Sequence, residues 1–422
     1  MKIMVIGGGG REHAIIKKLK ENKKAEVIYA LPGNGGIAAD AVCVNIGAKD
    51  IEGIVKFAVE NSVDFAVVAP DDPLVLGAVD SLEAKGIKCF GPSRDAAIIE
   101  GSKVFSKNLM EKYNIPTAKY KTFDNAGDAL EFLGTVNMPA VIKADGLALG
   151  KGVIIAQTEK EAADAIQLIM NDKKFGDSGN RVVIEEFLTG PEVSVLSFTD
   201  GKTIVPMISS MDHKRALDGD MGLNTGGMGT VAPNPYYTET VARECMEKIF
   251  IPTVNAMNAE GRTFKGCLYF GLMLTEDGPK VIEYNCRFGD PETQVVLPLL
   301  KSDLLEIMLA VAQERLSEVN VEFENKAACC VVAASEGYPE KYETGFEIEL
   351  PEDTDAEIFV AGAKLSEDGR LLSAGGRVLG VTATSETLGG AIEKAYSEIK
   401  KVNFCNMYYR RDIGAKALRA LD

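Results

Sequence analysis

The chain has 422 residues, of which 46% are hydrophobic and 26% charged, and its formal net charge is −16. This composition predicts a soluble globular protein of about three domains. So acidic a chain should be repelled by nucleic acid and by anionic lipid, and no apolar run is long enough to span a membrane. The eight cysteines include no CxxC pair, which is typical of reduced thiols, so we expect a cytoplasmic protein.

The first ninety residues alternate short apolar strands with amphipathic helices. We expect strands at 1–6, 25–31, 63–68 and 86–90, and helices at 11–19 and 51–59. Such alternation predicts a doubly wound parallel sheet. Its loops are rich in Gly, Pro and Asp, and folds of this kind bind ligands there.

Residues 122–188 predict a smaller α+β unit, in which Thr158 and Glu161 form a capping box at the start of a helix. Beyond residue 190 the pattern favours strands with long loops, then a final unit of short strands. The expected elements are helices at 126–133, 240–260, 302–316 and 391–401, and strands at 139–143, 153–157, 182–187, 330–334, 358–361 and 377–382. The expected units are 1–121, 122–189, 190–326 and 327–422.

Four glycines, 7–10, follow the first strand and precede Arg11 and His13. The exposed N–H groups of such a turn, at the positive end of a helix, favour an anion. The spacing does not match the dinucleotide fingerprint, because its third glycine position holds an acid or a histidine. We therefore interpret the turn as a phosphate or small-anion site, with a purely structural turn as the alternative.

Residues 143–152 place a glycine loop between two strands, with Lys143 at its start and Lys151 near its end. Such a loop can fold over a polyphosphate, although the sequence is not a Walker A motif. Glu185 and Glu186 end the strand that follows, beside a predicted hinge near Gly190. Solvated loops and strand ends are the alternative interpretation of both segments.

Asp212, Lys214 and the glycine-rich residues 224–229 concentrate polar and cationic groups in an acidic chain, which predicts a pocket for an anionic substrate. Glu283 and Asn285 share one side of a predicted strand, and their oxygen ligands suit Mg²⁺. Arg287 follows and can stabilise charge on a transferred phosphoryl group.

These segments together resemble one family, the phosphoribosylamine–glycine ligases (glycinamide ribonucleotide synthetases) of the ATP-grasp superfamily. The resemblance runs the length of the chain. It is most specific at Gly91-Pro92, Glu100-Gly-Ser-Lys103, 143–152, 212–215, 224–229 and 285–292, with Gly375-Gly-Arg-Val378 near the C-terminus. The chain departs from the family pattern at Asp71, Leu149 and Leu223.

The resemblance implies a multidomain α/β and α+β fold, with a Rossmann-like N-terminal domain, an ATP-grasp module carrying a small lid, and a small β-rich C-terminal domain. It implies a ligase of the second step of de novo purine biosynthesis. ATP would phosphorylate glycine, and 5-phosphoribosylamine would attack the glycyl phosphate to give glycinamide ribonucleotide, ADP and phosphate. The implied cofactors are ATP, as substrate, and Mg²⁺ or Mn²⁺. We expect a monomer whose partners are these small molecules, with no nucleic acid and no membrane.

The resemblance also implies roles for particular residues. Arg287 would be catalytic, and Glu283 and Asn285 would hold the metal. ATP would be bound by a set of lysines, lid glycines and linker residues: Lys103, Lys143, Gly150, Lys151, Gly152, Glu185, Glu186, Leu188 and Glu192. The other substrates would be bound by Gly9, Gly10, Asn34, Asp212, Lys214, Asn224, Thr225, Gly226, Gly227 and Met228.

Two other functions stay open at this point. One is an ATP-grasp ligase or carboxylase with a different acceptor, and the other is a nucleotide-sensing protein without catalysis. The arrangement of Glu283, Asn285 and Arg287 speaks against the second, because binding alone would not need it.

Overall fold

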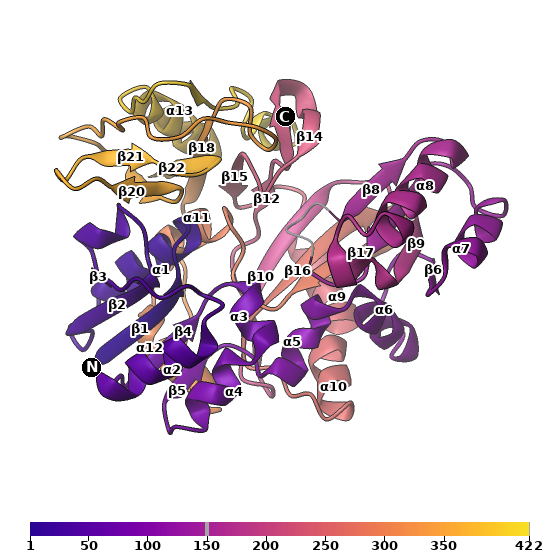
Figure 1. Ribbon diagram of the computed structural model, residues 1–422, viewed down its shortest axis with the longest axis horizontal. Coiled ribbons are helices and arrows are strands. Elements are labelled where there is room, and N and C mark those ends of the chain that lie inside the picture. The colour runs from indigo at the N-terminus through magenta and orange to yellow at the C-terminus, as the bar shows by residue number, and fades with distance from the viewer. Residues whose placement is uncertain (148–151, 422) are drawn as a thin grey trace.

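The computed structural model describes residues 1–147 and 152–421. Its N-terminal part is a sheet of five parallel strands in the order β3-β2-β1-β4-β5 (Figure 1). The elements are β1 (Lys2–Gly7), α1 (Gly10–Lys20), β2 (Val27–Pro32), β3 (Val42–Cys43), α2 (Ile51–Glu60), β4 (Phe65–Val68), α3 (Asp71–Leu76), α4 (Ala78–Glu83) and β5 (Lys88–Phe90).

Helices cover both faces of this sheet. Met4 and Ile6 of β1 share a core with residues of α2 and α4, whereas Ile3 and Val5 share one with α1 and with α12 (Leu304–Ala312). The predicted doubly wound sheet is confirmed. The strand order reverses between β1 and β4, so the glycine turn after β1 lies at the switch point, where such folds bind ligands.

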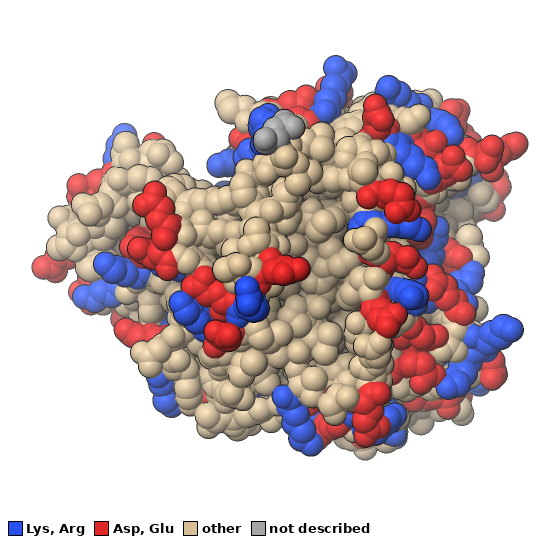
Figure 2. Space-filling model, turned by 180° about the vertical axis from the view of Figure 1, so that it is seen from behind, with Lys and Arg blue, Asp and Glu red and all other residues tan. Residues whose placement is uncertain are grey.

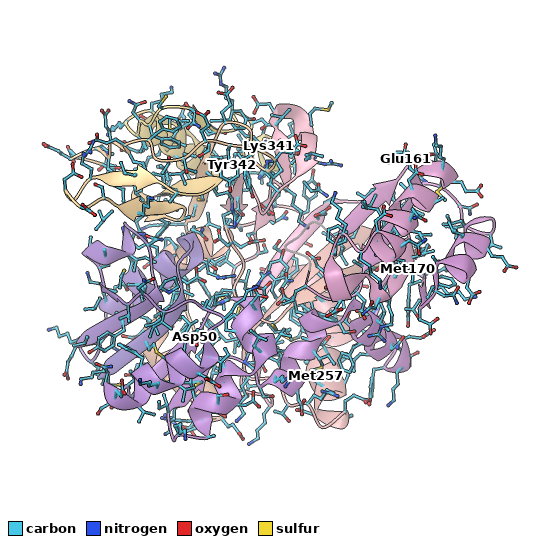
Figure 3. The ribbon with its side chains drawn as sticks, in the orientation of Figure 1. Asp50, Glu161, Met170, Met257, Lys341 and Tyr342 are labelled. Atoms are coloured by element: carbon cyan, nitrogen blue, oxygen red, sulfur yellow. The ribbon has the colours of Figure 1, made fainter. Side chains whose placement is uncertain are left out.

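Two helices, α5 (Arg94–Gly101) and α6 (Lys103–Lys112), connect this part to the lid, with Ser102 capping α6. The lid is an antiparallel sheet in the order β6-β9-β7-β8 with helices packed against it. Its elements are β6 (Tyr120–Phe123), α7 (Ala126–Leu133), β7 (Ala140–Ala144), β8 (Val153–Ala156), α8 (Glu159–Ile166) and β9 (Val182–Glu186). As predicted, Thr158 caps α8 by accepting a hydrogen bond from the N–H of Glu161, which lies at the outer end of the lid (Figure 3).

The central sheet is antiparallel, in the order β11-β10-β16-β17. Its strands and the helices around it are β10 (Glu192–Thr199), β11 (Ile204–Pro206), α9 (Glu239–Cys245), α10 (Ile251–Ala259), β16 (Gly266–Thr275), β17 (Gly278–Asn285), α11 (Thr293–Val296) and α12. The helix predicted at 240–260 is present, but it widens into a π-type turn over Met246–Phe250. Pro252 follows this turn and lacks the N–H that a regular helix would use there.

The C-terminal sheet takes strands from both sides of residue 326, in the order β12-β15-β18-β22-β19, with β23 paired to β18. Its strands and helices are β12 (Met211–Asp212), β15 (Gly229–Ala232), β18 (Ala327–Ser335), β19 (Glu357–Val360), β22 (Arg377–Ser385), α13 (Leu388–Ile399), β23 (Met407–Tyr408) and α14 (Ala415–Arg419). Two small hairpins form separate two-stranded sheets: β13 (Arg215–Leu217) with β14 (Met221–Asn224), and β20 (Ala363–Leu365) with β21 (Leu371–Ser373). The predicted substrate segment 212–228 therefore begins in β12 and connects it to the neighbouring strand β15 of this sheet.

Charged side chains of both signs are interspersed over the lid and the N-terminal part on the face shown in Figure 2. That pattern differs from the continuous basic stripe typical of nucleic-acid binding. Among the described residues, no helix has the length and apolar character needed to traverse a bilayer. All eight cysteines are free thiols.

Candidate functional site

The glycine turn after β1 lies against the segment that follows β17. The N–H of Gly9 donates to Glu12 Oε2 at 2.6 Å, at the start of α1. Arg11 Nη1 donates to Phe288 O at 3.1 Å, and the Arg11 N–H donates to Asp290 Oδ2 at 3.4 Å. The predicted anion turn therefore meets the segment after the predicted metal ligands.

Asn34, predicted to bind substrate, supports this turn from the loop after β2. Its Nδ2 donates to Gly8 O (3.0 Å) and Val360 O (2.8 Å), and its Oδ1 accepts from two backbone N–H groups. Both amide hydrogens and the amide oxygen are thus used within the protein. Substrate binding by Asn34, as by Gly9 and Gly10, stays a prediction.

Glu283 and Asn285 lie on one side of β17, with the buried Tyr284 between them facing the core. The Glu283 side chain is 33% exposed, and its Oε1 lies 3.9 Å from Lys214 Nζ. Asn285 Nδ2 donates to Glu100 Oε1 at 2.9 Å. The two predicted metal ligands are therefore neighbours in a partly enclosed, charged site.

Glu100, at the C-terminal end of α5, organises the residues that follow β17. Its Oε2 accepts from the N–H of Cys286 (2.7 Å) and its Oε1 from Arg287 Nη2 (3.0 Å). Burial raises the pKa of Glu100, and the charge of Arg287 opposes that rise. The sequence placed Glu100 in a motif but assigned it no role. The only feature of the sequence that could have indicated a role for Glu100 is the presence of an acid inside that motif.

Three lysines surround the Glu283 carboxylate. Burial alone would raise the pKa of Glu283, but Lys214 and the two lysines predicted to bind phosphate outweigh it and hold the pKa below its usual value. In turn, burial lowers the pKa of Lys103, and Glu283 opposes that shift. Cationic side chains thus gather around the ionised Glu283 carboxylate, an arrangement that suits a polyphosphate ligand.

Lys143 of β7 and Lys107 of α6 both form ion pairs with Glu185 of β9, where the lid meets α6. Lys143 Nζ lies 2.9 Å from Glu185 Oε1 and donates to Ile282 O at 3.1 Å, while Lys107 Nζ lies 3.0 Å from Glu185 Oε2. Burial lowers the pKa of Lys107 to about 8. Sequence reasoning missed Lys107, although it lies four residues after Lys103 on α6, a spacing that puts both on one helix face.

The lid loop is anchored to α6 at its beginning. Lys103 Nζ donates to Gly146 O at 2.8 Å, and Asp145 Oδ1 accepts from Ser102 Oγ (2.9 Å) and from the N–H of Val104 (3.1 Å). Gly152 O accepts from the N–H of Ala144 on the returning side. Two residues predicted to bind ATP, Gly150 and Lys151, and the departure at Leu149 lie outside the described residues.

The remaining predicted ATP contacts lie between the last residue of β9 and the first residue of β10. Glu186 Oε1 accepts from the N–H of Lys119 at 2.9 Å, and Leu188 is half-buried. Glu192 is exposed and lies 3.2 Å from Lys214 Nζ, which also lies 3.9 Å from Glu283 of the predicted metal pair. Both Glu185 and Glu192 are ion-paired, but Glu185 is buried whereas Glu192 is exposed.

Asp212 and Lys214 lie at the edge of the C-terminal sheet, facing the central sheet. Glu192 is the main cause of a raised pKa at Lys214, so this ammonium stays charged. Burial and the neighbouring Glu292 raise the pKa of Asp212. Thr225 Oγ1 donates to Lys214 O at 2.9 Å, which ties the two halves of the segment together.

Residues 224–228 are held by Arg377 from the C-terminal sheet. Arg377 Nη1 donates to Gly226 O at 2.7 Å and to Asp290 O at 2.9 Å, so one guanidinium joins two predicted motifs. The N–H of Gly226 donates to the Tyr338 hydroxyl, and Tyr338 packs edge-on against Tyr342, which lies beside this segment (Figure 3).

Not every residue of this segment is open to a ligand. Met228 is fully buried in the C-terminal core, so its backbone alone could contact a substrate. Asn224 ends the hairpin strand β14 opposite Arg215, and Gly227 is packed so closely against Pro291 that a Cβ atom would lie 2.4 Å from Cδ. Substrate binding by these residues stays a prediction.

The two histidines of the chain both have structural positions. His13 Nδ1 accepts from the N–H of Val360 at 2.9 Å, and its Nε2 lies 3.0 Å from Asp40 Oδ2, so it joins α1 to the C-terminal part. His213 Nε2 accepts from the N–H of Gly414 at 3.1 Å. Because that N–H can only donate, Nδ1 carries the proton of a neutral His213.

We expect His213 to destabilise the protein in acid. Burial lowers the pKa of His213 to about 4, below its unfolded value of about 6.5, so its contribution to stability is complete above 6.5 and is lost as the pH falls through 4. Between pH 7 and 4.5 the free energy of unfolding should fall by about 2 kcal/mol more in the wild type than in His213→Gln. Denaturant titrations at both pH values measure this, and equal losses in the two proteins would contradict it.

A divalent cation fits the pair on β17 by the chemistry of its donors. Glu283 and Asn285 supply carboxylate and amide oxygens, which Mg²⁺ and Mn²⁺ prefer. Within residues 1–147 and 152–421, no group of three or more His, Cys, Asp or Glu side chains could hold a metal ion. Protein side chains here supply too few ligands to enclose an ion, which suits a metal that shares its coordination with phosphate oxygens.

Comparisons with known proteins cover nearly the whole chain. The family profiles described as phosphoribosylglycinamide synthetase N domain, ATP-grasp (A) domain and C domain match residues 1–100, 101–293 and 328–416. The phosphoribosylamine–glycine ligase of Caldanaerobacter subterraneus is 49% identical over 416 residues, 98% of this chain and 100% of the relative. That of Escherichia coli O6:H1 is 46% identical and covers 99% of both chains.

Solved structures agree. The crystal structure of phosphoribosylamine–glycine ligase from Thermotoga maritima has a TM-score of 0.86 and 35% identity, over 98% of this chain and 100% of that one. A biotin carboxylase from Campylobacter jejuni has a TM-score of 0.74 at 14% identity, which shows a shared fold alone. The predicted fold class is therefore confirmed. The chain belongs to the phosphoribosylamine–glycine ligase family and is an ATP-grasp ligase.

Proposed function

We propose that this ligase joins the carboxyl group of glycine to the amine of 5-phosphoribosylamine through a glycyl phosphate, with ATP as the phosphoryl donor. The product is glycinamide ribonucleotide of purine biosynthesis, released with ADP and phosphate. The observation that carries the proposal is the meeting of three elements at one place. Lys143 of β7 donates to the carbonyl of Ile282, immediately before Glu283, and Glu283 also faces Lys214 from the substrate segment.

The triphosphate would lie over β17, between the lid and the central sheet. Lys103 and Lys143 would neutralise its charge, and the lid loop with Gly150, Lys151 and Gly152 would cover it. The linker with Glu185, Glu186, Leu188 and Glu192 would hold adenine and ribose. Its exposed acid, Glu192, fits the ribose hydroxyls better than the buried Glu185.

Glu283 and Asn285 would hold Mg²⁺ or Mn²⁺. When bound, the ion supplies positive charge to the phosphate oxygens during transfer. The protein's own contribution is to keep Glu283 ionised, which the surrounding lysines do, and to place Arg287 next to the pair. Arg287 would stabilise the charge that develops on the phosphoryl group.

The second half of the reaction would use the substrate segment. A carboxylate oxygen of glycine attacks the γ-phosphorus and ADP leaves; the amine then attacks the acyl carbon and phosphate leaves. No covalent enzyme intermediate is needed, so positioning carries the catalysis. Asp212, Lys214 and residues 224–228 would bind the two substrates beside Gly9 and Gly10. Arg377 supports this arrangement, because it holds Gly226 next to Asp290.

The same proposal includes the division into units at 1–121, 122–189, 190–326 and 327–422, a monomeric state and a cytoplasmic location. The eight free thiols support a reducing compartment. The central and C-terminal units would work as one, since β12 and β15 belong to the C-terminal sheet.

We expect ADP release to require glycine, phosphoribosylamine and Mg²⁺ together. With glycine labelled with ¹⁸O in its carboxyl group, the released phosphate should carry label, because a carboxyl oxygen becomes a phosphate oxygen in the acyl phosphate. A coupled ADP assay and mass spectrometry of the phosphate measure both results. Turnover without glycine would contradict the substrate, and unlabelled phosphate would contradict the intermediate.

A further inference from the structure

We propose that Glu100 is a positioning residue that fixes the orientation of the Asn285 amide, so that Asn285 Oδ1 rather than Nδ2 faces the nucleotide. The inference rests on the proposed role of Asn285 as a metal ligand and assigns the residue that makes it one. Glu100 lies at the end of α5, far from β17 in sequence, yet its carboxylate receives three hydrogen bonds from residues 285–287.

The amide of asparagine can face a ligand with either its oxygen or its nitrogen, and only the oxygen can bind a cation. An ionised carboxylate accepts hydrogen bonds and donates none. Glu100 Oε1 at 2.9 Å therefore selects the Nδ2 side of Asn285 and leaves Oδ1 on the other side. Within the described part of the chain, no group donates to Asn285 Oδ1.

The Glu100 carboxylate is itself held in one position. Its Oε2 accepts from the N–H of Cys286 at 2.7 Å, and that backbone group cannot rotate. The residue is 7% exposed, so water competes little for these bonds. Arg287 Nη2 binds the same Oε1 atom as Asn285, at 3.0 Å. One carboxylate oxygen thus sets both the proposed metal ligand and the proposed phosphoryl stabiliser.

The test compares the affinity of the full-length protein for the non-hydrolysable nucleotide AMPPNP in EDTA and in Mn²⁺. The ratio of the affinity in Mn²⁺ to the affinity in EDTA measures how much the metal contributes to nucleotide binding, and no turnover is needed. In Glu100→Gln the new side chain offers both a donor and an acceptor, so the Asn285 amide can turn. We expect this ratio to fall at least about tenfold, while the affinity in EDTA changes less than about threefold.

A second variant distinguishes a change in the orientation of the Asn285 amide from a general disruption of the site. Asn285→Asp alone places two carboxylates in contact, and we expect the ratio to fall. In the Glu100→Gln, Asn285→Asp double variant, the new amide nitrogen donates to the new carboxylate, whose other oxygen faces the metal. The ratio should return to within about threefold of the wild type, a non-additive recovery that a purely structural role would not give.

Asp71→Asn is the matched control, because Asp71 Oδ2 lies 4.0 Å from Arg287 Nη2 and forms no bond to Asn285. It should leave the ratio within about twofold of the wild type. An equal loss in Asp71→Asn, an unchanged ratio in Glu100→Gln, or no recovery in the double variant would each overturn the role of Glu100. If Glu283→Ala also leaves the ratio unchanged, the metal site itself fails; if only Glu283→Ala lowers it, the site stands and Glu100 does not orient it.

Discussion

Replacing Glu283 with alanine should lower kcat by about a thousandfold while leaving the protein folded. The Glu283 carboxylate is the anionic member of the proposed metal pair, and three lysines hold its pKa low so that it stays ionised. Its removal takes away a metal ligand and leaves those lysines without their shared counter-charge. Steady-state kinetics at saturating ATP, glycine and phosphoribosylamine give kcat, and the rate should not recover at higher Mg²⁺.

The control is Glu192→Ala, which removes the other carboxylate beside Lys214 and leaves β17 intact. Here we expect kcat within about tenfold of the wild type, with the main change in the KM for ATP. Because the Glu283 side chain is 33% exposed, its loss should shift the Tm by no more than about 2 °C. Near-normal kcat in Glu283→Ala would show that the metal pair is elsewhere.

Period-two alternation explains why the sequence predicts that Glu283 and Asn285 lie on one side of β17, whereas their role as metal ligands stays a prediction. An apolar residue between two oxygen ligands predicts both ligands on one side of a strand, and Tyr284 is indeed buried between Glu283 and Asn285. The doubly wound sheet could also be predicted, because its strands and helices alternate and are separated by loops rich in Gly, Pro and Asp. A local sequence pattern is thus sufficient to place residues that lie close together in the chain.

Glu100 and Lys107 were missed for the opposite reason. Both are charged residues on helices, where the default expectation is a solvated face, and sequence does not show that tertiary contacts bury them. Lys107 is stabilised by Glu185, 78 positions further on, and Glu100 by residues 285–287. These pairs form across contacts between different units of the fold, and the pattern of a single sequence does not show which units contact each other.

Hairpin β13–β14 and helix α13 show a second limit. The sequence analysis predicts no element for this hairpin, because its turn depends on Gly219 and Gly222 with positive φ, and such glycines indicate a loop as readily as a turn. Helix α13 was expected at 391–401 but begins at Leu388, three residues earlier. Its first turn contains Gly389 and Gly390, which disfavour a helix, yet Thr387 caps it by accepting from the Gly390 N–H.

Arg287→Lys should lower kcat by about a hundredfold or more, with the KM for ATP changed by less than about threefold. Arg287 is fixed by Glu100 at 3.0 Å and donates to Phe288 O, while its Nε hydrogen is buried with no partner among the described residues. A donor held in place and left unsatisfied is suited to a group that forms during the reaction. Lysine keeps a positive charge near Glu100, so the fold should be retained. It lacks the planar guanidinium group with its several N–H donors.

The effect should appear in the chemical step itself. Rapid-quench measurement of ADP formed in the first turnover should show the full loss, because the interaction is made with the transferring phosphoryl group and not with bound ATP. A first-turnover rate close to that of the wild type would contradict this. A loss confined to the KM for ATP would instead make Arg287 a ground-state phosphate contact, and phosphoryl stabilisation would then fall to Lys103 and Lys143, which already face the same carboxylate.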